Sequence, residues 1–274
     1  MVGLEAAVRG IIGASGAARV GVAAGRLGGP PTLLVHASEP FYAASTMKVA
    51  VMLELYRRAW AGTIGLDEPV VVGNAFRSAV DGTPFVLDPA GDSDNGLYAL
   101  EGVAVPAGEL ARRMIVRSSN LAANLLMDRL GPPAVDAAVG RLGITGVRVV
   151  RGVCDDRAFR AGMNSTVTAA GLAMLLELIA DGRAAPPDAC AAMLETLSAQ
   201  EFNEGIPAGL PPGTRVAHKT GWITALYHDA GVVYPVDARP YVLVVLTEGL
   251  NEAAAAPALV AAIAREVHAS LGSG

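Results

Sequence analysis

Apolar and polar residues alternate along the chain in two patterns, one typical of helices and one typical of strands. Apolar residues at helical spacing predict helices over 4–13, 45–61, 109–116, 121–130, 134–142, 168–181, 188–198 and 252–271. Short apolar runs bounded by Gly and Pro predict strands over 19–24, 32–36, 216–221, 230–234 and 241–246. Residues 62–108 are expected to be surface loops and turns with short elements such as residues 69–72, and residues 144–163 are expected to be an irregular loop. Asn164-Ser165-Thr166 is expected to cap the helix that follows.

The predicted strands lie near the two ends of the chain, and helices fill its middle. One sheet built from both ends, with a helix at each terminus, gives an α/β (α+β) fold with an antiparallel sheet and an inserted all-helical domain. We therefore expect a discontinuous sheet domain made of residues 1–40 and 205–274, and a helical domain made of residues 41–204. The active site is expected in the cleft between these two domains.

The predicted helix at 45–61 is apolar nearly all round, which indicates that it is buried. It begins with Ser45-Thr46-Met47-Lys48, and residues three apart on a helix lie on one face. A serine hydroxyl beside an amine is a candidate nucleophile with its base. The alternative interpretation is an N-cap serine followed by a surface lysine.

Composition and charge exclude some classes of partner. With 274 residues, 52% of them hydrophobic, the chain can bury a large core. A net charge of −5 without a basic block, together with an aromatic content of 5%, argues against nucleic-acid binding. Lys48 and Lys219 are the two lysines among 21 basic residues, and the others are arginines. Because the pKa of a lysine shifts readily on burial whereas an arginine stays charged, both positions are candidates for sites that need an amine.

The sequence predicts no metal site, no cofactor and no membrane span. The two cysteines and four histidines form neither a metal-ligand spacing nor a paired cluster. The longest apolar runs are too short to cross a bilayer. The N-terminus lacks a charged start followed by an apolar core, so no signal peptide is predicted. We expect a monomer that is cytoplasmic, or periplasmic or secreted if a leader has been trimmed.

Three short motifs occur in a fixed order along the chain. Ser45-x-x-Lys48 opens the buried helix, Ser118-x-Asn120 lies at a break between two helices, and Lys219-Thr220-Gly221 lies on a strand. In this order and these settings they resemble the penicillin-recognising serine enzymes, most closely the class A β-lactamases, whose motifs are S-x-x-K, S-D-N and K-T-G. The resemblance covers nearly the whole chain and includes the runs 118–126 and 228–233.

The resemblance and the chemistry of the side chains together imply how an acyl-enzyme would form. Ser45 is the expected nucleophile, and it needs a base because a hydroxyl is a weak attacker at neutral pH. Lys48 can take the proton if burial and a second cation such as Lys219 lower its pKa. Ser118 can relay a proton to the leaving nitrogen.

The remaining motif residues are expected to bind the substrate. Asn120 can hold the substrate amide, and Lys219 with Thr220 can bind a substrate carboxylate, with Gly221 beside them. The resemblance implies that the backbone N–H groups of Ser45 and Trp222 form an oxyanion hole. Each donor of such a hole contributes roughly 10²–10³ in rate.

Two positions depart from the class A pattern. Ser119 stands where the middle motif usually has Asp, and we expect little effect on the chemistry because that Asp is mostly structural. Class A enzymes also carry a loop Glu that activates water to release the acyl group, and by resemblance Cys154 stands at that position. A cysteine is a poor base for water, and losing a positioned base costs about 10²–10⁴-fold.

The two acidic residues after Cys154 have two open interpretations. Asp155 or Asp156 is a candidate replacement for the missing Glu, with a shorter side chain and an offset along the loop. The alternative is that both form ion pairs with nearby loop arginines. Cys154 itself is either an ordinary half-buried thiol or an introduced substitution.

The remaining candidates are expected to be structural. His228 is expected to be a satisfied histidine at a strand start, His218 to pack, and Cys190 to fill the core. Trp222 is expected to line the cleft.

The leading hypothesis is a serine hydrolase acylated at Ser45 by a small-molecule β-lactam or a related peptide-like amide, with slow deacylation. One alternative is an esterase, an amidase or a D-alanyl-D-alanine peptidase on the same scaffold. Another is a penicillin-binding or sensing protein that is acylated without turnover.

Overall fold

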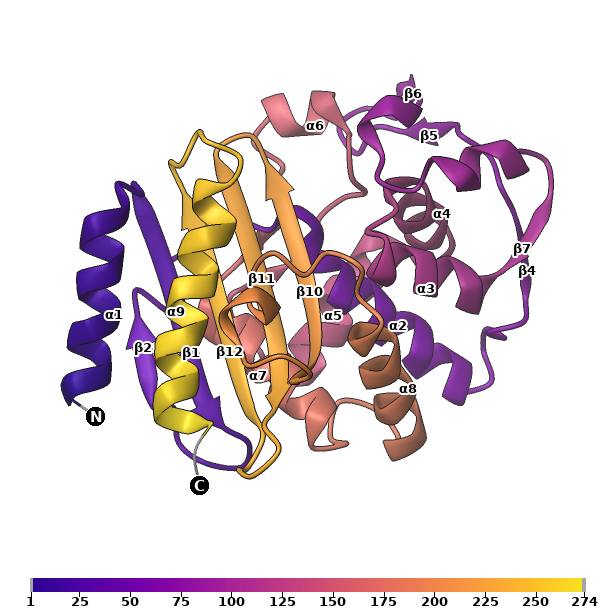
Figure 1. Ribbon diagram of the computed structural model, residues 1–274. Coiled ribbons are helices and arrows are strands. Elements are labelled where there is room, and N and C mark those ends of the chain that lie inside the picture. Colours follow the sequence, from indigo (N-terminus) through magenta and orange to yellow (C-terminus); the bar gives the residue numbers. More distant parts are fainter. Residues whose placement is uncertain (1, 273–274) are drawn as a thin grey trace.

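The computed structural model describes residues 2–272, and its main sheet has five antiparallel strands flanked by helices (Figure 1). The five strands are arranged in the order β10-β11-β12-β1-β2, and every neighbouring pair is antiparallel. Their bounds are β1 Arg19–Arg26, β2 Leu33–Val35, β10 Arg215–Ile223, β11 Leu226–Tyr234 and β12 Tyr241–Glu248. Strand β1 pairs along its whole length with β12, so the two ends of the chain complete one sheet, as the sequence predicts.

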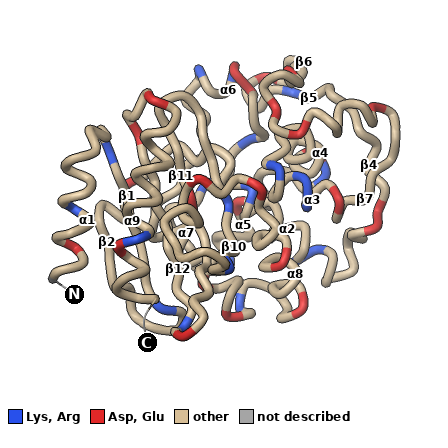
Figure 2. The backbone as a smooth tube through the Cα atoms, in the orientation of Figure 1, with Lys and Arg blue, Asp and Glu red and all other residues tan. Residues whose placement is uncertain are grey.

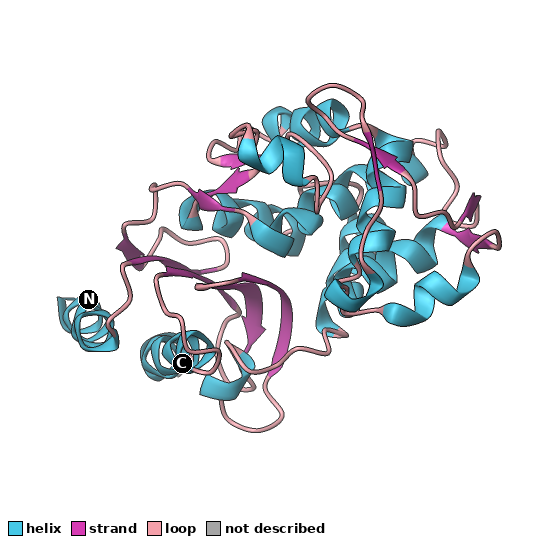
Figure 3. Cartoon of the chain, turned by 90° about the horizontal axis from the view of Figure 1, so that it is seen from above, coloured by secondary structure: helices cyan, strands magenta, loops and turns pink. Residues whose placement is uncertain are grey.

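Both faces of this sheet are buried, which explains why its central strands are continuous apolar runs. Successive side chains of a strand point to opposite faces. In β12, Leu243 and Val245 pack into the core beneath the terminal helices, whereas Val244 and Leu246 pack into the larger core beneath the helical middle. The terminal helices α1 (Val2–Ser15) and α9 (Ala255–Leu271) cover one face, as Figure 3 shows from above.

The helical middle packs around helix α2 (Lys48–Trp60). Nine consecutive residues of α2 are buried, so its apolar sequence has neighbours on every side. The helices around it are α3 Ala107–Val116, α4 Asn120–Leu130, α5 Pro132–Arg141 and α8 Pro187–Ser198, and α7 Ala169–Ala180 packs against the sheet. Basic and acidic residues are interspersed along the whole chain (Figure 2).

The middle of the chain also contains short strands and turns, of which the sequence indicates only the element at residues 69–72. Three two-residue strands form a small sheet in the order β3-β9-β8 (Phe41–Tyr42, Thr166–Val167 and Val147–Arg148). The remaining short elements are β4 Pro69–Val71, β5 Phe76–Arg77, β6 Pro84–Phe85, β7 Ala104–Pro106, α6 Asp156–Arg160 and the 3₁₀ turns η1 Ala44–Met47, η2 Pro89–Gly91, η3 Asn95–Leu100 and η4 Pro207–Gly209. The division into domains at residues 40/41 and 204/205 stays a prediction.

Two predicted helix starts are wrong in detail. Residues 44–47 form the 3₁₀ turn η1 and α2 begins at Lys48, so Ser45 is not the N-cap of α2, which has Met47 at that position and no side-chain cap. Helix α7 is capped by Thr168, whose hydroxyl accepts from the N–H of Gly171, and not by residues 164–166. No helix among the described residues is both long and apolar enough to span a bilayer.

Candidate active site

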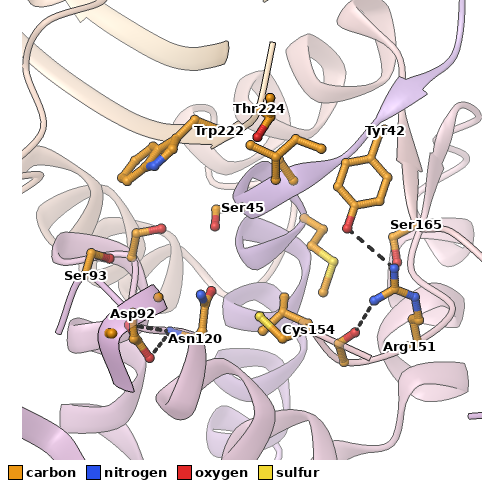
Figure 4. A pocket seen from close by; sticks show the side chains of 18 residues that line it. Tyr42, Ser45, Asp92, Ser93, Asn120, Arg151, Cys154, Ser165, Trp222 and Thr224 are labelled. Atoms are coloured by element: carbon orange, nitrogen blue, oxygen red, sulfur yellow. Dashed lines mark hydrogen bonds between the residues drawn. The ribbon is translucent and has the colours of Figure 1, made fainter. Parts of the chain in front are cut away.

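A cavity of about 580 Å³ opens between the end of β10, the turn η1 and three loops of the helical middle. Ser45 faces it from η1, with Asn120, Cys154 and Trp222 around it (Figure 4). Ser45 is half-buried, and its hydroxyl makes no hydrogen bond to any other described residue. Its hydroxyl is therefore available to a ligand in the cavity.

The backbone at Ser45 is held in a specific geometry by strand β10. Ala44 has a φ of 44°, a left-handed conformation that is uncommon for residues with a side chain. A Cβ atom added to Gly221 would lie 2.9 Å from the backbone nitrogen of Ser45 and 3.0 Å from that of Thr46. Only a glycine at this place in the Lys219-Thr220-Gly221 motif lets η1 approach β10 so closely. The first N–H groups of a helical turn have no partner within the turn, so the N–H of Ser45 is free to bind a ligand.

Lys48 lies beneath the cavity and is completely buried. Its Nζ donates to the backbone oxygen of Ser118 at 2.6 Å and to Oδ1 of Asn120 at 2.9 Å, and it lies 3.4 Å from Oγ of Ser118. Burial lowers the pKa of Lys48 to about 8, while the charge of Asp92 and, once the thiol is ionised, that of Cys154 raise it. Among the described hydrogen bonds, none joins Lys48 to Ser45.

Lys219 is the second buried amine of the site. Its Nζ donates to Oγ of Ser118 at 3.0 Å and to the backbone oxygen of Thr220 at 2.8 Å. Burial holds the pKa of Lys219 well below its usual range, and the neighbouring Lys48 lowers it further. The sequence predicts that burial and a second cation such as Lys219 lower the pKa of Lys48, and of these two causes burial is the one that lowers it.

The structure thus brings residues of all three motifs together around the Ser118 hydroxyl, which lies between the two amines. Ser118 itself has a left-handed backbone, with a φ of 56°. Ser118 and Trp222 line the cavity at this place, whereas Lys219 and Thr220 are fully buried and do not line it. The Thr220 hydroxyl has no hydrogen-bond partner among the described residues.

Trp222 follows this motif and lines the cavity, as expected. Its side chain is 41% exposed, and its ring meets that of Phe202 edge-on at 4.8 Å. The residue forms one wall of the cavity at the end of β10 (Figure 4).

Cys154 lines the cavity from the opposite side, on the loop between β8 and α6, and it is an exposed residue rather than a half-buried one. Its φ of 58° is again left-handed. Burial raises the pKa of the Cys154 thiol, and Lys48 opposes this effect. The loop is fixed to α4 by Asn124, whose side chain donates to the oxygen of Val153 at 3.0 Å and accepts from its N–H at 2.7 Å.

Neither acidic neighbour of Cys154 lines the cavity. The buried carboxylate of Asp155 accepts hydrogen bonds from Oγ of Ser78 and the N–H groups of Ala79 and Ala158. Asp155 therefore caps α6 and does not pair with a loop arginine. Asp156 is exposed and, among the described residues, forms no ion pair. The predicted loop ion pairs are wrong for both residues.

The loop arginines have other partners. Arg157 pairs with Asp81 at 3.2 Å. Arg151 is buried and donates to the backbone oxygens of Met163 and Gly152 and to Oδ1 of Asn164. It stabilises the loop that carries Cys154.

Asp92 also lines the cavity, although no sequence motif marks it. It lies in the loop-rich segment 62–108 and accepts hydrogen bonds from the N–H groups of Asn120 and Leu121. Ser119 caps the same helix by accepting from the N–H of Ala122. The missing Asp in the Ser118-x-Asn120 motif was the only hint that a carboxylate from elsewhere is needed at this helix end.

The remaining candidates are structural. Nδ1 of His228 accepts from the N–H of Thr247 and its Nε2 lies 2.9 Å from the oxygen of Tyr42, so the expected satisfied histidine is confirmed. Burial lowers the pKa of His228 to about 4 and keeps it neutral. His218 does more than pack, because its Nδ1 lies 2.8 Å from a carboxylate oxygen of Asp229. Cys190 is buried in the core as expected, and no cluster of three or more metal-ligating side chains occurs among the described residues.

Several known proteins are similar to this chain in sequence or in fold. The profile of the beta-lactamase enzyme family matches residues 3–271. The extended-spectrum beta-lactamase PER-1 of Pseudomonas aeruginosa is 25% identical over 249 residues, which are 86% of this chain and 77% of PER-1. A beta-lactamase structure from Sphaerobacter thermophilus is 28% identical with a TM-score of 0.83, covering 98% of this chain and 97% of that one. A mutant of PBP-A, solved as an acyl-enzyme complex with penicillin G, shares the fold at 23% identity and a TM-score of 0.82, covering 98% and 96% of the two chains.

Proposed function

Because the chain belongs to the beta-lactamase enzyme family and is a serine β-lactamase-like hydrolase, we propose that Ser45 is its nucleophile and is acylated by a β-lactam or a related amide. The observation that carries this proposal is the Ser45 hydroxyl, which is open to the cavity and lies one turn from the buried amine of Lys48. A serine with a nearby base of lowered pKa is the arrangement that nucleophilic catalysis needs.

Lys48 is the proposed base for acylation. With a pKa of about 8, a fraction of its amine is neutral near physiological pH and can accept the proton of Ser45. Ser118 is the proposed relay to the leaving nitrogen, since its hydroxyl lies between the amines of Lys48 and Lys219. A positioned acid or base of this kind contributes roughly 10²–10⁴ in rate.

The proposed oxyanion hole consists of the backbone N–H groups of Ser45 and Trp222. Both residues line the cavity, and Gly221 lets η1 and the end of β10 approach each other closely. Donors fixed in this way stabilise the negative charge that develops on the carbonyl oxygen in the transition state.

A Gly221→Ala substitution is expected to slow acylation by about 10²–10³-fold, the usual loss when one oxyanion donor is displaced. The new methyl group would press on the backbone nitrogens of Ser45 and Thr46, which cannot move without shifting η1. The rate of adduct formation with a penicillin measures the effect. Gly73→Ala is the matched control, because a Cβ there meets nothing within 4 Å. Equal acylation rates for the two variants would contradict the proposed hole.

Substrate binding is assigned to Asn120 and to the cationic end of β10. Nδ2 of Asn120 donates to no described residue while its Oδ1 accepts from Lys48, so the amide N–H group is left for a substrate carbonyl. The Lys219 amine lies below the cavity surface, and its protonated form favours an anionic ligand. We propose that Thr220 and Gly221 bind beside it, at the place where a substrate carboxylate approaches β10.

Deacylation is proposed to be slow. The loop that faces Ser45 across the cavity presents Cys154, whose raised pKa keeps it a neutral thiol near pH 7. Neither Asp155 nor Asp156 lines the cavity, so neither is placed to activate water there. The acyl group on Ser45 therefore lacks a positioned base for its release.

Incubation with penicillin G, followed by intact-mass measurement over time, tests the proposal. We expect one covalent adduct per chain that forms faster than it decays, and no adduct on a Ser45→Ala variant. Absence of both adduct and turnover in the natural sequence would overturn the β-lactam assignment. Fast multiple turnover would overturn slow deacylation alone.

A second candidate function is a binding or sensing protein that is acylated once. The observation that favours it is the one used for slow deacylation: the loop facing Ser45 carries the thiol of Cys154 where a water-activating base would stand. An adduct that persists without release would support this function, and measurable turnover would exclude it.

A further inference from the structure

We propose that Asp92 is a positioning residue of this site. It holds the start of α4 and the motif residues there, and so replaces the aspartate that the motif usually has where this chain has Ser119. The inference rests on the proposed function, because it concerns the acylation step at Ser45.

The carboxylate of Asp92 is the main anchor of the α4 N-terminus. It accepts from the N–H of Asn120 at 3.1 and 3.0 Å and from the N–H of Leu121 at 2.9 Å. Figure 4 shows Asp92 directed at Asn120 from the facing loop. The start of a helix carries unpaired N–H groups and partial positive charge, so a carboxylate is the preferred partner there.

Ser119 satisfies only part of this helix end. Its hydroxyl accepts from the N–H of Ala122, one turn into the helix. The N–H groups of Asn120 and Leu121 donate to Asp92 instead, which lies in a loop that precedes α4 in the chain. Asp92 thus adds a negative charge at a motif that contains none of its own.

Asp92 is itself held rigidly. The hydroxyl of Tyr98 donates to its Oδ2 at 2.9 Å, and the N–H of Asp94 donates to its Oδ1 at 3.1 Å. Asp94 is in turn paired with Arg113 of α3 at 2.9 Å. A carboxylate fixed on both oxygens can fix the helix end that it contacts.

The position of Asp92 also connects it to the proposed base. Asn120, which it anchors, accepts a hydrogen bond from Lys48. The charged and titratable groups around Lys48 are Asp92 and Cys154, which raise its pKa, and the Lys219 amine on β10, which contacts the same Ser118 hydroxyl. Because the charge of Asp92 raises the pKa of Lys48, its removal is expected to lower that pKa further.

The first test is an Asp92→Asn variant, with penicillin G acylation of Ser45 followed as a function of pH. An amide offers one acceptor oxygen where the carboxylate offers two, so Asn120 and the groups beside it are displaced and we expect the maximal acylation rate to fall about 10-fold or more. We also expect the rising limb of the pH–rate profile to move to lower pH, because the neutral form of Lys48 becomes easier to reach. Asp88→Asn is the matched control, since Asp88 is exposed on the same loop and caps η2 through the N–H of Ala90.

The second test restores a carboxylate at the helix end by combining Asp92→Asn with Ser119→Asp. Recovery of the acylation rate and of the pH limb, relative to Asp92→Asn, would support the proposal. A Ser119→Asp variant that retains Asp92 places two carboxylates at one helix end, and a lower melting temperature is expected for it.

Two results would overturn the inference while leaving the proposed function intact. The first is that Asp92→Asn is acylated at the same rate as the unsubstituted protein and that the rising limb of its pH–rate profile lies at the same pH. The other is a reduced rate that the double variant does not recover although it melts like the natural sequence. If the natural sequence itself forms no adduct, the proposed function fails instead.

Discussion

Replacing Cys154 by glutamate is expected to shorten the lifetime of the penicillin adduct by about 10²–10⁴-fold, the contribution of a positioned general base. Cys154 lines the cavity that Ser45 faces, on a loop fixed by Asn124 and Arg151. A glutamate there would place a carboxylate at the cavity surface with room for a water beside the acyl group. The measurement is the decay of the adduct mass after excess penicillin has been removed.

The matched control for this substitution is Cys154→Gln. Glutamine has nearly the same size and must adopt the same left-handed backbone, with a φ of 58°, but it is not a base. If both variants release the acyl group at one rate, the loop position has been wrongly assigned. The glutamate also adds a negative charge near Lys48, which raises the pKa of that amine. The rising limb of the pH–rate profile for acylation is therefore expected to move to higher pH in Cys154→Glu but not in Cys154→Gln.

The sheet could be predicted because its signals are local. Strands β1, β11 and β12 are apolar runs between turn residues, and β1 and β12 pair along their whole length. The buried helix α2 was equally clear, because nine consecutive buried residues leave no polar face in the sequence. Patterns of this kind depend on burial, which the sequence records directly.

The short strands could not be predicted for the opposite reason. β3, β8 and β9 contain two residues each, too few to show an alternation, and they form only because the loops carrying them meet. The 3₁₀ turn at Ser45 was missed because its geometry is imposed by the close approach of β10 at Gly221, far along the chain.

The candidate site divides in the same way. Lys48 and Lys219 were found from composition, since each is a lysine in a chain that otherwise uses arginine, and both prove to be completely buried. Asp92 was missed because a carboxylate in a Gly- and Pro-rich segment has no local mark of its role. Its partner is a helix end that only the folded chain brings near. Residues that act through long-range contacts of this kind are invisible to spacing alone.

Replacing Lys48 by methionine is expected to reduce the acylation rate about 10²–10⁴-fold, the loss expected when a positioned base is removed. Methionine is close to lysine in length and suits a fully buried position, so the helix start is expected to be retained. In the natural sequence the acylation rate should rise with pH through about 8, because the neutral amine is the base and its pKa is about 8. In Lys48→Met this rise should be lost.

The companion variant Lys48→Arg separates the two roles that a buried cation can have. Arginine keeps the positive charge but stays protonated, so it cannot accept the proton of Ser45. If Lys48 is the base, both variants lose the rate and the pH limb near 8. If Lys48→Arg is acylated at the natural rate while Lys48→Met is not, Lys48 acts through its charge, and the base must be sought at Lys219, whose amine contacts the Ser118 hydroxyl and whose pKa is lowered by the same burial.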